Sequence, residues 1–528
     1  MIRSFLTVST GTLASRLLGF ARDAMMAALL GAGPVADAFL VAFQLVNVVR
    51  RLLTEGALNA ALVPAWLQVR ETEGAGAAAA FAGRVLGTIS AALIVATAVI
   101  GLLMPLVITA LAPGFIGHET LQFAVDDARL MLPYLAFAGP ATVMMALLNA
   151  QARFALTAFS PLLFNIALIA VMIVLFGWRG DAASAALVIA ATVGIAGLVQ
   201  LLILVLRTGS VAGGRLAGGS IASPLRITFD PQMRDFLGKA IPGMIAGAGP
   251  QLRVVAGAII ASSSPSAVSW LYFANRLIEL PLGIVGVAMG TVLVPELTRA
   301  LRIDDQPSMA HAQSRGLELA VGLALPATLG LVALHEPVVR LLFEHGVFTA
   351  ADTAATAQAL MWLALGLPAQ VLVKALSPAF FARGDTMTPL VATLKGFVVA
   401  IVLAVILGHV YGAGGIAASI ALGAWSSAAA LIRHGAVSFG FSIDAAARRR
   451  LPRIVLAALA MGAALWLAAP FALASGTSPH GVARALVVAV LISGGIAIYG
   501  LFLALLGVIR RGEVVNAIRQ TRGSGLRD

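Results

Sequence analysis

The stretch SRLLGFARDA, residues 15–24, carries two arginines and an aspartate inside the first long apolar run of the chain. A charged side chain at the centre of a membrane helix costs about 2.5–3.5 kcal/mol on insertion scales, and more in simulations. Arg16, Arg22 and Asp23 therefore need a hydrated cavity, a counter-ion or a position at the membrane edge.

The composition around this stretch is that of an all-α, polytopic membrane protein. Of the 528 residues, 60% are hydrophobic and 11% are charged, and the mean hydropathy is +0.99, whereas soluble domains carry about 25% charged residues. Apolar runs recur along the whole chain and are too long for the strands of a β-barrel. The net charge of +12 comes from basic residues between apolar runs and does not indicate a nucleic-acid partner. Because cysteine is absent, a disulfide framework and thiolate chemistry are excluded.

The apolar runs predict fourteen transmembrane helices, the first of which we interpret as a retained span and not a signal peptide. These spans cover roughly residues 5–31, 35–68, 80–111, 122–151, 156–177, 183–206, 236–262, 266–300, 312–334, 354–382, 387–411, 413–437, 452–473 and 482–509.

The loops between these spans alternate in charge. Lys and Arg gather in loops such as 207–239 and 433–453, whereas GAGPVAD (31–37), SSSPS (262–266) and HVYGAGG (409–415) contain neither residue. The positive-inside rule then predicts that both termini lie in the cytoplasm, which an even number of spans permits.

The two halves of the chain resemble each other. DAFLVAFQLVNVV (37–49) resembles VSWLYFANRLIEL (268–280), and ALNAALVP (57–64) aligns with AMGTVLVP (288–295). Two six-helix lobes inserted the same way up predict a pseudo-two-fold axis along the membrane normal, a transporter architecture. The expected organisation is an N-lobe at 1–206, a cytoplasmic linker at 207–235, a C-lobe at 236–438, and two further helices with a cytoplasmic tail at 439–528.

Charged residues recur in the second span and in its counterpart, the eighth. They are Asp37, Arg50, Arg51 and Glu55 in the second, and Arg276 and Glu279 in the eighth. Spacings of three and four residues allow Arg276 to pair with Glu279, and Arg51 with Glu55. Two interpretations stay open: ion pairs that fix helix packing, or a cationic cavity for an anionic ligand. Guanidinium suits phosphate because it donates bidentate hydrogen bonds and stays charged when desolvated.

Three stretches resemble the MurJ (MviN) family of bacterial lipid II flippases. They are SRLLGFARDAMMAALLGAGPVADAFLVAFQLVNVVRRLLTEGALNAALVP (15–64), SAVSWLYFANRLIELPLGIVGVAMGTVLVPELT (266–298) and FFARGDTMTP (380–389). The resemblance covers the first twelve spans. Two positions depart from the family pattern: Gln44 stands where relatives carry Lys, and Asn275 where some carry Asp.

The resemblance implies membership of the multidrug/oligosaccharidyl-lipid/polysaccharide exporter superfamily. It implies that two lobes move lipid II, an undecaprenyl-pyrophosphate glycolipid, from the cytoplasmic to the periplasmic leaflet of the inner membrane by alternating access. The cavity arginines that it implies fall on Arg16, Arg22, Arg50 and Arg276, and the second-helix aspartate falls on Asp37. The remaining motif positions are Asp23, Arg51, Glu55, Ser269 and Glu279.

No covalent chemistry and no certain cofactor are expected, so we expect a transporter and not an enzyme. Coupling to a sodium ion, a proton or the membrane potential is left open, and no metal site is assigned. The expected partners are lipid II and membrane lipids, with the chain acting as a monomer and association with the cell-wall synthesis machinery left open.

Other function classes fit less well. A polysaccharide-unit or drug exporter of the same superfamily is the alternative within transporters. A membrane enzyme acting on polyprenyl phosphate would need acidic residues for metal or base work, and no DxxD pair lies within a span. GDTMTP (384–389) could form a phosphate loop, but an Asp or Thr cap with Pro389 in the first helical turn is favoured.

Overall fold

Helices make up every regular element in the described part of this computed structural model. The structure describes residues 2–54, 57–151, 154–178, 180–212, 225–246, 249–289, 306–381, 383, 385–439, 444–474 and 481–508. Nine helices in these ranges are long and apolar enough to cross a membrane. The predicted class, an all-α polytopic membrane protein, is confirmed, and the count of fourteen spans stays a prediction.

The chain packs as two compact units. The first comprises residues 1–269 and 345–349, and the second comprises 270–344 and 350–528. The helices that begin in the first unit are α1 (Ile2–Leu30), α2 (Pro34–Thr54), α3 (Ala57–Thr72), α4 (Ala75–Leu102), α5 (Met104–Leu111), η1 (Pro113–Phe115), α6 (Glu119–Met131), α7 (Pro133–Ala150), α8 (Phe154–Phe176), α9 (Ala182–Ala212), α10 (Pro231–Ala246), α11 (Gly249–Ala261) and α12 (Ala267–Ala288). Those of the second unit are α14 (Gln306–Ala333), α15 (His335–Phe343), α16 (Ala350–Phe381), α17 (Met387–Phe439), α18 (Ala445–Ala474) and α19 (Gly481–Leu505).

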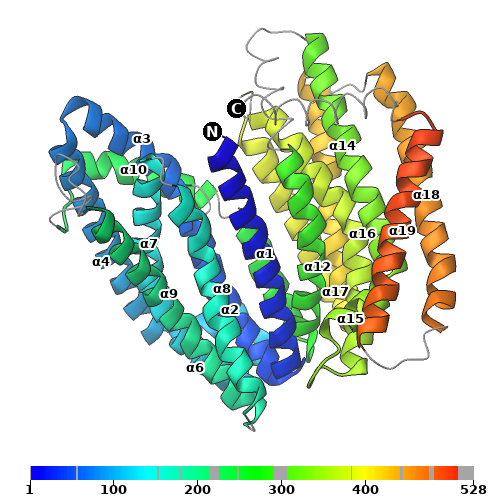
Figure 1. The fold of residues 1–528 in the computed structure, drawn as a ribbon, viewed down its shortest axis with the longest axis horizontal. Helices are drawn as coiled ribbons and strands as arrows, with labels where there is room; N and C mark the ends of the chain where they lie inside the picture. Colours follow the sequence, from blue (N-terminus) through cyan, green and yellow to red (C-terminus); the bar gives the residue numbers. More distant parts are fainter. Residues whose placement is uncertain are drawn as a thin grey trace. The chain divides into compact units, whose positions relative to one another are not determined.

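In the first unit, α1 packs along α8, and α2 packs on α6 and α7 (Figure 1). The α10 helix packs on α3 and the α11 helix on α2, so both belong to this unit by contact. The division into lobes at 1–206 and 236–438 rests on the internal repeat, which contacts do not test, and it stays a prediction.

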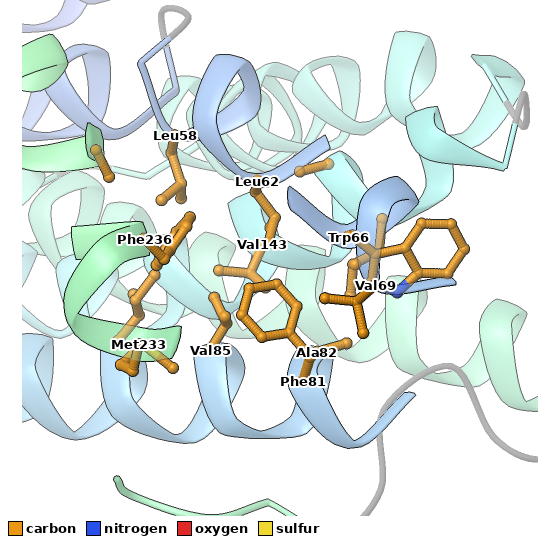
Figure 2. Packing of buried hydrophobic residues seen from close by; sticks show 14 of the residues in the cluster. Leu58, Leu62, Trp66, Val69, Phe81, Ala82, Val85, Val143, Met233 and Phe236 are labelled. Atoms are coloured by element: carbon orange, nitrogen blue, oxygen red, sulfur yellow. The ribbon is translucent and has the colours of Figure 1, made fainter. Parts of the chain in front are cut away.

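An apolar cluster joins α3, α4, α7 and α10 at one end of the first unit. Leu62, Trp66, Phe81 and Phe236 are all at most 4% exposed, and the rings of Phe81 and Phe236 meet edge to face at 6.1 Å (Figure 2). The predicted span at 35–68 thus consists of α2 and a separate helix, α3. An apolar window cannot separate the two, because α3 turns its apolar side to neighbouring helices and not to lipid.

Two other predicted spans also resolve into pairs of helices at prolines. Residues 80–111 form α4 and α5, with Pro105 in the first turn of α5. Residues 122–151 form α6 and α7, with Pro133 at the start of α7. Proline lacks a backbone N–H and so favours the first helical turn over the interior.

In the second unit, α14 packs on α16 and α18, and α18 packs on α19. Leu334, Met461, Leu465 and Leu491 form a buried cluster where α18 and α19 meet the end of α14. The predicted spans 13 and 14, placed outside the repeat, correspond to this α18–α19 pair.

The α17 helix contains the predicted boundary between spans 387–411 and 413–437. Gly412 has φ 54° and ψ −136°, which is not helical and which L side chains rarely adopt. The two arms then lie against each other, because a Cβ on Gly423 would sit 2.5 Å from the carbonyl oxygen of Gly396. The structure thus confirms a helix break at this boundary.

Residues 385–389 of the GDTMTP stretch form the capped start of α17. The backbone N–H of Thr388 donates to Oδ1 of Asp385 at 2.9 Å, and Pro389 lies in the first turn of α17. Hydrogen bonds from the side chain and the backbone of Thr388 lower the pKa of Asp385. The favoured interpretation of this motif is therefore confirmed.

We predict that Gly423→Ala lowers the thermal midpoint of the purified protein. The new Cβ would meet the Gly396 carbonyl at 2.5 Å and the Ala400 Cβ at 2.7 Å, so the arms of α17 must separate. Gly500→Ala in α19 is the matched control, since its Cβ would meet nothing within 4 Å and alanine is the better helix former. Equal midpoints for the two variants would show that the arms of α17 are not in contact.

Candidate functional site

The Arg22 side chain lies inside the helix bundle of the first unit. The residue is 8% exposed, and its Nε and Nη2 donate to Oδ1 of Asp23 at 2.9 and 2.6 Å. Its Nη1 donates to Oδ1 of Asn165 on α8 at 3.0 Å. All three nitrogens of the guanidinium are therefore bonded to side chains of the same unit.

Aromatic rings close the space around this guanidinium. Its carbon atom lies 5.0 Å from the ring centre of Phe43 on α2 and 5.9 Å from that of Phe164 on α8. A cation over an aromatic face is stabilised by the ring quadrupole, most strongly where water is excluded. Arg22, which lies on α1, thus contacts both α2 and α8.

Asn165 completes the link between α1 and α8, and the sequence interpretation missed it. Its amide nitrogen donates to the backbone carbonyl of Ser15 at 3.2 Å, while its oxygen accepts from Arg22. An asparagine within the apolar run SPLLFNIALIA (160–170) was the available signal. A polar side chain inside an apolar span is expected to have a partner on a neighbouring helix.

Arg16 lies in a different environment from Arg22, although both are on α1. Six residues of α-helix turn by about 240° beyond a full rotation, and Arg16 is exposed while Arg22 is buried. Arg50 and Arg51 near the end of α2 are half-buried, and Arg50 donates to Oδ1 of Asn47 at 3.3 Å. The cations of the predicted set that keep some exposure in the first unit are thus Arg16, Arg50 and Arg51.

Asp37 and Ser269 form a buried pair within the first unit. Asp37 is 2% exposed and Ser269 is 0% exposed, and Asp37 accepts both the backbone N–H of Ser269, at 2.9 Å, and its hydroxyl. Ser269 lies in the first turn of α12, just after Ser266, whose φ is +62°. A carboxylate at a helix N-terminus accepts otherwise unpaired N–H groups and interacts favourably with the helix dipole.

The Arg276–Glu279 ion pair predicted from a spacing of three residues is present in the second unit. Nη1 of Arg276 lies 2.8 Å from Oε2 of Glu279, with side chains 22% and 34% exposed. The amide of Asn275 donates to the other oxygen of Glu279 at 3.4 Å. Nearby, the indole N–H of Trp270 donates to Asp352 at 3.0 Å and so attaches the first turns of α12 and α16.

Six of the ten predicted site residues thus form three local pairs, and the binding role of all ten stays a prediction. Arg22 is joined to Asp23, Asp37 to Ser269, and Arg276 to Glu279. Glu55 lies outside the described residues. Among the described residues, no three His, Cys, Asp or Glu side chains are grouped to hold a metal ion.

Comparison with known sequences identifies the family of this chain. The family model described as "Lipid II flippase MurJ" matches residues 26–481. A probable lipid II flippase of Rhizobium meliloti (strain 1021) is 39% identical over 524 residues, covering 97% of this chain and 96% of the relative. A probable lipid II flippase of Rhizobium tropici is 35% identical over 529 residues, covering 99% of this chain and 97% of that relative.

Solved structures show the same fold. A lipid II flippase in an inward closed conformation superimposes with a TM-score of 0.77 at 21% identity, covering 96% of this chain and all of that chain. An inward-facing multidrug resistance transporter of the MATE family and the MOP superfamily gives a TM-score of 0.66 at 14% identity, covering 85% of this chain and 98% of that chain. With the family model matching most of its length, the chain belongs to the lipid II flippase MurJ family.

Proposed function

We propose that this protein carries lipid II from the cytoplasmic to the periplasmic leaflet of the bacterial inner membrane by alternating access. The observation that carries this proposal is the family match over residues 26–481, with a probable lipid II flippase aligned over 97% of the chain. Basic loops on one side of the predicted spans support an orientation with both termini in the cytoplasm.

Arg16, Arg50 and Arg276 are the residues proposed to bind the pyrophosphate of the headgroup. Arg16 is exposed, and the other two are half-buried on α2 and α12. A guanidinium in a partly dehydrated site donates two parallel hydrogen bonds to phosphate oxygens and stays charged. Arg51 lies beside Arg50 and contributes to the same positive field.

Arg22 and Asp23 have a different proposed role, the positioning of α1. The guanidinium is already bonded to Asp23 and Asn165, so it fixes the rotation of α1 against α8. In this account Arg22 determines where Arg16 lies, and Arg16 contacts the ligand.

The energetics of transport need no covalent step. An inside-negative potential favours outward movement of an anion by about 2.3 kcal/mol per charge for each 100 mV. Coupling to a sodium ion or to a proton is the alternative source of energy for the same cycle. The chain is proposed to act as a monomer.

Arginine variants separate these two roles. We predict that Arg16→Ala abolishes growth of cells that depend on this copy, while the purified protein keeps its thermal midpoint. Arg22→Ala is predicted to lower both the growth of these cells and the thermal midpoint of the protein, because breaking a buried ion pair costs about 3–5 kcal/mol. Arg449→Ala, an exposed arginine of α18, is the control and should change neither. Normal growth with Arg16→Ala would contradict the binding role.

A double-mutant cycle tests the Asp37–Ser269 pair. Asp37→Asn and Ser269→Ala each remove part of one hydrogen-bonded arrangement. We therefore predict that the double variant is destabilised by less than the sum of the destabilisations of the two single variants. Contacting residues typically show coupling of about 0.5–3 kcal/mol in free energy of unfolding. Additive effects in reversible denaturation would show that the two side chains do not stabilise α12 together.

Export of polysaccharide units or drugs is the second candidate, since the MATE transporter shares the fold. Reconstituted protein that moves a cationic drug but not lipid II would support that alternative.

A further inference from the structure

Residues 225–230, directly before α10, carry three large apolar side chains that the protein does not cover. Leu225 is 65% exposed, Ile227 66% and Phe229 61%. They occupy alternate positions in the sequence LRITFD, and exposed Arg226 lies among them. Large exposed apolar side chains in one short segment indicate an interaction surface.

Hydrogen bonds from Arg226 and Thr228 and an ion pair of Asp230 attach the segment to α4. Thr228 exchanges two hydrogen bonds with the hydroxyl of Thr88, at 3.2 and 3.3 Å, and Asp230 lies 3.2 Å from the guanidinium of Arg84. A Cβ on Gly87 would sit 2.7 Å from the carbonyl oxygen of Arg226. The absence of a side chain at Gly87 therefore lets the backbone of the segment lie directly on the helix.

The side of α4 that carries the segment continues as an exposed apolar surface. Eleven and eighteen residues are close to three and five helical turns, so Val95 and Leu102 lie on the same side of α4 as Arg84. Val95 is 61% exposed and Leu102 is 81% exposed. In a membrane protein, exposed apolar side chains along one side of a spanning helix face lipid.

The depth of the segment follows from the rise of the same helix. From Gly83, which accepts the N–H of Arg226, to Leu102 the rise is about 28 Å at 1.5 Å per residue. The hydrocarbon core of a bilayer is about 30 Å thick. The segment therefore lies about one hydrocarbon thickness from Leu102, so it lies at a membrane–water boundary when Leu102, the last residue of this candidate span, lies at the opposite one.

We propose that residues 225–229 insert into the headgroup region of the adjacent leaflet and anchor the linker of the first unit to anionic phospholipid. Leu225, Ile227 and Phe229 occupy the upper acyl region, while Arg226 and the exposed Arg234 of α10 meet phosphate groups. In the proposed orientation this is the cytoplasmic leaflet. The lipid bilayer is favoured over a protein partner because the segment continues a lipid-facing surface.

Spin labelling tests this anchor directly, because the chain contains no cysteine. Single variants Ile227→Cys, Val95→Cys and Gly76→Cys carry a nitroxide in vesicles of phosphatidylethanolamine, with and without phosphatidylglycerol. Val95 is the lipid control, and exposed Gly76, whose Cβ would meet nothing within 4 Å, is the aqueous control. The measured quantity is the ratio of label accessibility to oxygen and to a water-soluble nickel chelate.

We expect the ratio at position 227 to lie between the two controls, severalfold above that at position 76. Phosphatidylglycerol should raise this ratio, and the double substitution Arg226→Gln with Arg234→Gln should remove that increase.

A ratio equal to that at position 76 would place the segment in water and overturn the anchor. Low accessibility to both reagents would indicate a protein cover and also overturn it. A ratio unaffected by phosphatidylglycerol would overturn the role of anionic headgroups. Phe229→Cys repeats the measurement at a second exposed position, should Ile227→Cys fold poorly.

Discussion

The ion pair between Arg22 and Asp23 is the constraint that the first unit must satisfy. Both residues are almost fully buried among apolar helices, where an unpaired charge is far more costly than in water. The guanidinium bonds Asp23 and Asn165 and lies over two aromatic rings, so the charges are compensated only while α1, α2 and α8 stay packed. A buried charge thereby specifies how three helices lie against one another.

The same constraint explains why the charged residues of the family motif divide into two kinds. Asp37 accepts hydrogen bonds from the first turn of α12, and Arg22 donates to its neighbours on α1 and α8. Both residues therefore hold helices in place. Arg16 and Arg50 retain full and partial exposure, and they are the residues for which we propose contact with an anionic headgroup. Rigidly held helices that present accessible guanidinium groups are what recognition of a pyrophosphate requires.

Much of the fold could be predicted from sequence because local rules determine it. Hydrophobic runs predicted the helical class, the boundary between the predicted spans 387–411 and 413–437 coincides with the break at Gly412 in α17, and a spacing of three predicted the Arg276–Glu279 pair. The separation of α3 from α2 could not be predicted, since an apolar run does not show whether its side chains meet lipid or protein. Asn165 bonds a residue 143 positions away, and no local pattern contains that contact. The pairing of Asp37 with Ser269, 232 positions apart, was missed for the same reason.

The central claim is that this chain delivers lipid II to the outer leaflet. Its most direct test is the amount of lipid II accessible on the periplasmic face after rapid depletion of the protein, in cells without another lipid II transporter. Our account predicts that accessible lipid II falls while lipid II accumulates on the cytoplasmic side. Continued appearance of lipid II in the outer leaflet at the original rate would contradict it.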